Sequence, residues 1–90
     1  MEIEFDRVKA AENLLRHGIG FPDAAQALQD PVGVTLEDPD AVGEQRLVTI
    51  GMDALGRVLV VVYTLRAERT RLISARKASK AEAEQYARRI

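Results

Sequence analysis

The first part of the chain carries apolar residues at helical spacing. Residues 7–17 have an apolar stripe on one side, made of Val8, Ala11, Leu14 and Leu15. The spacing places Lys9 and Asn13 on the other, exposed side of this helix. Asp6 is a good N-cap, and Gly18 follows the helix as the expected left-handed cap.

A second, shorter helix is predicted to end near Gln29. Gly20 can serve as its N-cap, and Pro22 is tolerated in the first turn because no internal N–H bond is lost there. Pro31 disfavours helical backbone at the residue before it. The buried side is expected to comprise Phe21, Ala24, Ala25 and Leu28. Two helices joined by a glycine turn predict a helical hairpin.

The rest of the chain is dominated by strand-like runs rich in Val, Ile, Leu and Thr. The short gaps between them predict an antiparallel meander. Residues 57–66 are apolar on both faces and are expected to form the central strand. Residues 1–5 alternate and suggest a short strand or an extended lead-in. The remaining runs are residues 32–38, 46–53 and 70–76.

A last helix is predicted over residues 80–90. Ser79 and Glu82 have the spacing of a capping box. The alanines of this segment are too small for a strong core helix, so we expect either loose packing or packing against a partner. The predicted fold is a single α+β domain over residues 1–90, an antiparallel β-sheet with an N-terminal helical hairpin on one face and a C-terminal helix.

Composition narrows the class of protein. Ninety residues make one domain, and the absence of cysteine excludes a disulfide framework and a thiolate metal site. The N-terminus lacks a secretory apolar core. The longest apolar run, residues 58–65, is far shorter than the ~20 residues of a membrane helix. We therefore expect a soluble cytoplasmic protein with no membrane association.

Charge is distributed unevenly along the chain. Residues 1–45 carry three basic and ten acidic groups, a net charge of −7, whereas residues 46–90 carry ten basic and four acidic groups, a net charge of +6. One interpretation is two solvated faces. The other is a cationic surface suited to phosphate or to an acidic partner. Because the whole chain carries only −1, any such site must be local.

An ordered set of motifs resembles a known family. The set comprises Asn13, 17-HGIGF-21, 30-DP-31, 44-EQR-46, Gly51, 60-VVVYTLR-66, 71-RLISARKA-78 and Tyr86. No single motif is specific, but the order of the motifs along the chain is specific. This order resembles the one found in the BrnT family of bacterial type II toxins. The similarity spans nearly the whole chain.

The resemblance implies a RelE-like fold and metal-independent, cofactor-free cleavage of RNA that arrests growth. It also implies a cognate BrnA-like antitoxin with a ribbon-helix-helix DNA-binding part. Contact with DNA would then be indirect, through the antitoxin. The residues themselves also allow a non-catalytic cationic module that docks an acidic partner.

Cleaving RNA without a metal requires proton transfer and neutralisation of charge on the phosphorane. Arginine suits the second task because its planar fork matches two phosphate oxygens. Strand alternation puts Arg71 and Arg76 on opposite faces unless a bulge intervenes. We therefore favour Arg66 and Arg76 as catalytic, with Arg46 close behind.

Two further residues are candidates for catalysis. His17 is the only histidine, and its ordinary pKa of ~6.5 suits a proton shuttle. A histidine at a helix C-terminus also stabilises the helix dipole, so both interpretations stay open. Tyr86 can stack on a base, donate a proton or pack on the helix surface.

The remaining candidates are expected to bind RNA: Lys9, Asn13, Arg71 and Lys77. For each, the alternative is a solvated surface residue. One histidine and scattered carboxylates give no ligand spacing of the kind that zinc or calcium requires, so no metal is expected.

Overall fold

The computed structural model describes residues 2–88. The elements are β1 (Glu2–Glu4), α1 (Arg7–His17), α2 (Phe21–Leu28), β2 (Val34–Glu37), β3 (Leu47–Met52), β4 (Val58–Arg66), β5 (Arg69–Lys77) and α3 (Lys80–Ala87). Their order is the predicted one. Positions 89 and 90, which were assigned to the last helix, lie outside the described residues. No helix within residues 2–88 is long and apolar enough to span a membrane.

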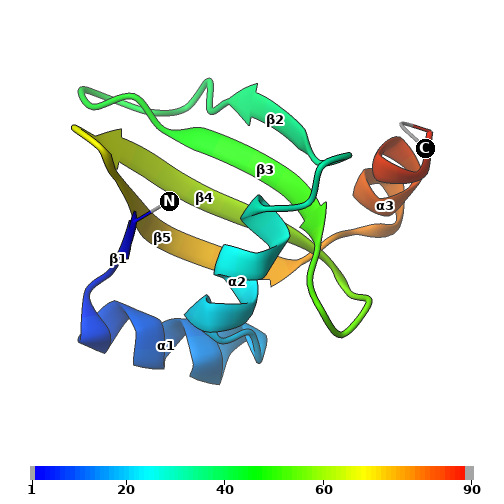
Figure 1. Ribbon diagram of the computed structural model, residues 1–90, viewed down its shortest axis with the longest axis horizontal. Coiled ribbons are helices and arrows are strands. Elements are labelled where there is room, and N and C mark those ends of the chain that lie inside the picture. The colour runs from blue at the N-terminus through cyan, green and yellow to red at the C-terminus, as the bar shows by residue number, and fades with distance from the viewer. Residues whose placement is uncertain (1, 89–90) are drawn as a thin grey trace.

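The five strands form one sheet in the order β1-β5-β4-β3-β2, with β4 in the centre as predicted (Figure 1). Strands β2 to β5 are antiparallel, but β1 pairs with β5 in parallel, so the sheet is mixed and the purely antiparallel prediction is wrong. The guanidinium of Arg69 in β5 forms ion pairs with the carboxylates of Glu2 at 3.3 Å and Glu4 at 3.5 Å, and these pairs join β1 to β5. The pairing also satisfies backbone groups that β5 would otherwise expose.

Helices lie on both faces of the sheet. α1 packs on β5, and α2 packs on β3, β4 and β5, while α3 reaches the other face near β3 (Figure 1). The larger core, between the sheet and the first two helices, comprises Ile19, Phe21, Ala24, Ala27, Leu59, Val61, Tyr63, Leu72 and Ala75. The smaller core, beneath α3, comprises Val34, Ile50, Val60 and Tyr86. Because α1 and α2 mainly contact strands, direct hairpin packing and the RelE-like label stay predictions.

Helix α2 approaches the sheet closely at Gly51. A Cβ atom there would lie 2.2 Å from the carbonyl oxygen of Ala27, which no side chain can tolerate. The absence of a side chain therefore lets the helix backbone rest directly on β3.

Helix α1 faces the opposite way from the prediction. Its caps are as expected, since Asp6 accepts from the backbone N–H of Val8 at 2.8 Å and Gly18 adopts a left-handed φ of 71°. Asn13, however, is only 6% exposed, whereas Leu15 is 89% exposed. The prediction that Asn13 lies on the exposed side is therefore wrong.

Hydrogen bonding explains this reversal. The Asn13 amide donates to the carbonyl oxygens of Ile19 at 3.0 Å and Ala75 at 2.9 Å, and its oxygen accepts from the Ala75 N–H at 3.0 Å. Beyond Arg71, β5 has no strand neighbour on this side. Asn13 thus substitutes for a missing strand, because buried backbone groups left unpaired are costly.

A bulge in β5 changes which arginines share a face. Val62 pairs with Ser74 but Tyr63 pairs with Leu72, so Ile73 is an extra residue. Arg71 pairs with Thr64 and Arg76 with Val60, and both therefore lie on the face away from α1 and α2. The prediction that alternation separates these two arginines is wrong for this reason.

Candidate functional site

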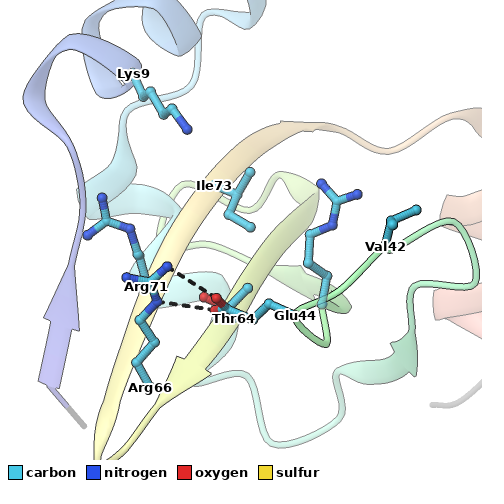
Figure 2. A pocket seen from close by; sticks show the side chains of 8 residues that line it. Lys9, Val42, Glu44, Thr64, Arg66, Arg71 and Ile73 are labelled. Carbon is cyan, nitrogen blue, oxygen red and sulfur yellow. Dashed lines mark hydrogen bonds and ion pairs between the residues drawn. The ribbon is translucent and has the colours of Figure 1, made fainter.

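A pocket of about 340 Å³ opens on the face of the sheet away from α1 and α2. Its lining residues are Lys9, Val42, Glu44, Arg46, Thr64, Arg66, Arg71 and Ile73 (Figure 2). Four of these side chains are cationic and one is a carboxylate. We call it the cationic pocket.

Four different segments of the chain supply the cations. Lys9 reaches in from α1, Arg46 precedes β3, Arg66 ends β4 and Arg71 belongs to β5. Pairing of Thr64 with Arg71 places the last two arginines at neighbouring positions of the same face. Of the nine residues predicted to act on RNA, these four are the ones that meet.

Glu44 occupies the centre of the cationic pocket. Its two carboxylate oxygens accept from the Nε and Nη2 atoms of Arg66, each at 3.2 Å, as the dashed lines of Figure 2 mark. Arg66 first, and the nearby Thr64 hydroxyl second, hold the pKa of Glu44 below its ordinary value. A planar, bidentate anion therefore already sits on the guanidinium in the way a phosphate would.

The other two arginines are paired more loosely at the rim. Arg46 Nε lies 3.6 Å from Asp38, and Arg71 Nη1 lies 3.6 Å from Glu4. Such half-exposed pairs exchange readily for a stronger ligand because water screens them. Lys9 forms no ion pair with any of the described carboxylates.

Glu44 and Thr64 were not among the predicted site residues. Thr64 is 4% exposed, and its hydroxyl makes no hydrogen bond of normal geometry within residues 2–88. Both residues lie within motifs that carry the family resemblance, 44-EQR-46 and 60-VVVYTLR-66, but the motifs do not show that the two side chains meet. The cross-strand register would have been needed to find either.

Arg76 lies on the same face but outside the cationic pocket. Its guanidinium is bound by both oxygens of Glu82, at 2.7 and 2.9 Å. This pairing lowers the pKa of Glu82 to about 2. Glu82 also completes the predicted capping box with Ser79, so Arg76 connects β5 to the start of α3.

Tyr86 is also remote from the cationic pocket. It is 4% exposed, and its hydroxyl donates to the carboxylate of Asp30. That hydrogen bond, together with burial, raises the pKa of Tyr86 to about 12. Asp30 also accepts from the Met52 and Val32 N–H groups, so the arrangement joins α3 to the end of α2 and β3.

The other predicted residues do not line the cationic pocket either. His17 is the exposed last residue of α1, in the carboxyl-terminal turn of the helix. Lys77 pairs with Leu59 and so belongs to the opposite face of the sheet. The side-chain amide of Asn13 is hydrogen-bonded to backbone carbonyl groups. Within residues 2–88 no three His, Cys, Asp or Glu side chains gather as a metal site.

Comparison with known proteins decides the family. The family described as "Ribonuclease toxin, BrnT, of type II toxin-antitoxin system" matches residues 5–82. The chain belongs to the BrnT family. The crystal structure of the Brucella abortus ribonuclease toxin BrnT is similar, with a TM-score of 0.65 and 26% identity, covering 89% of this chain and 99% of that one. Among curated proteins, none matches the chain.

The BrnT assignment agrees with the resemblance given by the motif order. It makes the chain a ribonuclease toxin at the level of the family, and a type II system implies an antitoxin partner. The cationic pocket is the part of the described structure that suits such chemistry.

Proposed function

We propose that this BrnT chain is an endoribonuclease and that the cationic pocket holds the scissile phosphate. The observation that carries the proposal is the convergence of Lys9, Arg46, Arg66 and Arg71 from four segments on one pocket. Like charges repel and are kept close only where an anion compensates them. A phosphorane with its extra negative charge is such an anion.

In this mechanism, the RNA phosphate displaces Glu44 from Arg66. The phosphate takes the bidentate place, and Arg71 and Arg46 neutralise the charge that develops on the equatorial oxygens. Loss of the arginine lets the pKa of Glu44 rise toward its ordinary value, because the partner that lowered it is gone. Glu44 then accepts the proton of the 2′-hydroxyl, and the 2′-oxygen attacks phosphorus to form a 2′,3′-cyclic phosphate. The bond from phosphorus to the 5′-oxygen breaks, and Lys9 donates a proton to that leaving oxygen.

This assignment differs from the expectation drawn from the sequence alone. Arg66 keeps the predicted role, and Arg71 replaces Arg76 beside it. His17 and Tyr86 stabilise helix α1 and the docking of α3, respectively. Cleavage without a metal or cofactor remains part of the proposal. RNA cleavage should therefore be fully retained when a metal chelator is added.

The test is cleavage of a single-stranded RNA by the purified chain and its alanine variants. Removing one phosphate-binding arginine, Arg66→Ala or Arg71→Ala, is expected to slow cleavage by about 100-fold or more. Arg76→Ala and His17→Ala are expected to stay within a few-fold of the parent. Arg88→Ala removes an exposed cation from α3 and is the matched control. Loss of cleavage in Arg76→Ala alone, with the fold intact by circular dichroism, contradicts the proposed pocket.

A second function is favoured by one observation. The pocket arginines already contact the carboxylates Glu44, Asp38 and Glu4. The same cations therefore suit an acidic protein segment, and the chain would then be a binding module without catalysis. Absence of RNA cleavage by the parent chain, with tight binding of an acidic partner that Arg66→Ala weakens, would favour this alternative.

A further inference from the structure

The most unusual feature outside the cationic pocket is the outward apolar face of α1. Val8 is 65% exposed, Leu14 54% and Leu15 89%. Seven residues of α-helix return to within about 20° of the starting direction, so Val8 and Leu15 point the same way. We call the surface formed by Val8, Ala11, Leu14 and Leu15 the outer face of α1.

Nothing in residues 2–88 covers this outer face. The main contacts of α1 are with β5, on the side of Asn13 and Ala10. An amphipathic helix normally turns its apolar stripe toward the core. Here Asn13 and Ala10 face the sheet, because Asn13 is needed at the edge of β5, and the apolar stripe is left to solvent. A contiguous apolar row of this kind marks an interaction surface.

The charges beside the outer face indicate the chemistry of the partner. Arg7 and Arg16 are exposed at the two ends of the helix and form no ion pair with the described carboxylates, and Glu12, between them, is the one carboxylate of α1, so the helix surface keeps a net positive charge. The first turn of α1 contains no acidic residue. The complementary surface is therefore an apolar stripe flanked by carboxylates, as an amphipathic acidic helix presents it.

A second copy of the chain fits this surface poorly. If two α1 helices packed antiparallel about a two-fold axis, Arg7 of one would lie near Arg16 of the other. Two such contacts would each bring like charges together. A partner with the opposite charge avoids this repulsion.

We infer that the outer face of α1 is the docking surface for an amphipathic, acidic helix of the antitoxin. The inference rests on the toxin–antitoxin assignment of the proposed function but not on the cationic pocket. Lys9 lies on the same helix yet points to the pocket, so the two surfaces share α1 without sharing a side chain. Substitutions can therefore affect one surface and leave the other unchanged.

The experiment measures binding to the protein encoded beside the toxin gene. That protein is separated from the co-expressed complex and immobilised for interferometry. The variant is Val8→Glu with Leu15→Glu, since glutamate is a good helix former and both positions are exposed. Leu55→Glu places the same charge at a side chain that is 70% exposed in the β3–β4 turn and serves as the matched control.

We expect the Val8→Glu, Leu15→Glu variant to raise the Kd for the antitoxin by about 30-fold or more, as loss of a central apolar anchor does. Leu55→Glu should stay within twofold. The charge-reversed variant Arg7→Glu with Arg16→Glu should lower the association rate with the antitoxin, and the decrease should be larger at low salt, where charges are less screened. RNA binding by all variants should be unchanged, so a failure of the RNA pocket and a failure of this docking surface are distinguishable.

Two results would overturn the inference. One is an unchanged Kd for the Val8→Glu, Leu15→Glu variant that retains the parent's circular dichroism spectrum and Tm. The other is a free parent chain that is dimeric by light scattering and becomes monomeric in that variant. The outer face would then be an interface between copies of this chain.

Discussion

At the scale of single residues, the cationic pocket depends on one carboxylate. Glu44 holds Arg66 by two hydrogen bonds of 3.2 Å and lies among four cations. Its negative charge stabilises the empty pocket, because the arginines would otherwise repel one another. In the proposed mechanism, the same charge competes with RNA phosphate for Arg66. Glu44 thus has opposite effects on the stability of the free chain and on substrate affinity.

The substitution Glu44→Gln separates binding from chemistry. Glutamine keeps the shape but not the charge, so RNA should bind about fivefold more tightly, in line with the modest strength of exposed ion pairs. Cleavage of bound RNA should slow by about 100-fold, as loss of a general base does. Glu84→Gln on α3 makes the same change in net charge and should alter neither quantity. Binding by fluorescence anisotropy and single-turnover cleavage measure the two effects; unchanged cleavage at tighter binding would exclude the base role.

At the scale of elements, α3 is held on the sheet by two polar contacts. Arg76 binds Glu82 at the start of the helix, and Tyr86 binds Asp30 at its end. Alanine dominates the apolar positions between them. Polar contacts at both ends therefore do much of the docking that side-chain burial does in larger helices.

Tyr86→Phe tests whether this tyrosine acts in docking or in catalysis. Removing a hydrogen bond to a charged group should lower the free energy of unfolding by about 1.5–3 kcal/mol, while RNA cleavage is retained. Because the pKa of Tyr86 is raised from 10.0 to about 12, its contribution is present below pH 10 and is lost as the pH rises through about 12. Parent and variant should thus converge in stability above that pH.

The matched control for this test is Tyr63→Phe. That hydroxyl is also buried, but its partner is the neutral Thr49 hydroxyl at 2.8 Å, so a smaller loss is expected. Denaturant unfolding measures both variants. A Tyr86→Phe chain that is as stable as the parent but cleaves RNA much more slowly would assign the hydroxyl to catalysis.

At the scale of the whole molecule, acidic and basic residues are concentrated in different halves of the chain, although their total charges nearly cancel. The chain carries a net charge of −1, and the acidic N-terminal half supplies Glu2, Glu4 and Glu44 to arginines of the basic half. Within residues 2–88, six arginines form ion pairs with carboxylates, which is half of the described cations. In the proposed function, attraction for RNA comes from the four cations that converge on the cationic pocket, not from the net charge of the chain.

RNA binding should therefore show a limited dependence on salt. Each phosphate of single-stranded RNA that the protein neutralises contributes a slope of about −0.7 in a plot of log K against log salt. A single phosphate held by all four cations therefore predicts a slope of about −0.7, and one phosphate per cation predicts a slope of about −3. Arg66→Ala should reduce the slope by about 0.7, and Arg88→Ala should leave it unchanged. Titration of affinity between low and physiological salt measures this. A slope near −6 would indicate a much larger binding surface.

The sequence by itself determined what depends on short-range chemistry. The caps at Asp6, Gly18 and Ser79 follow from local hydrogen bonding and backbone freedom, and all three are observed. The order of elements and the central position of β4 follow from apolar patterns over a few residues. Arg66 was also found in this way, because it ends a strand whose alternation is regular.

Tertiary structure decided which side chains meet. The extra residue Ile73 brings Arg71 to the same face as Arg76, and the parallel pairing of β1 supplies Glu4 to Arg71. Helix α1 directs Asn13 rather than its apolar stripe toward the sheet, because the backbone groups of Ala75, 62 residues away at the edge of β5, need hydrogen-bond partners. These outcomes depend on long-range pairing and on satisfying buried polar groups, for which no local pattern carries a signal.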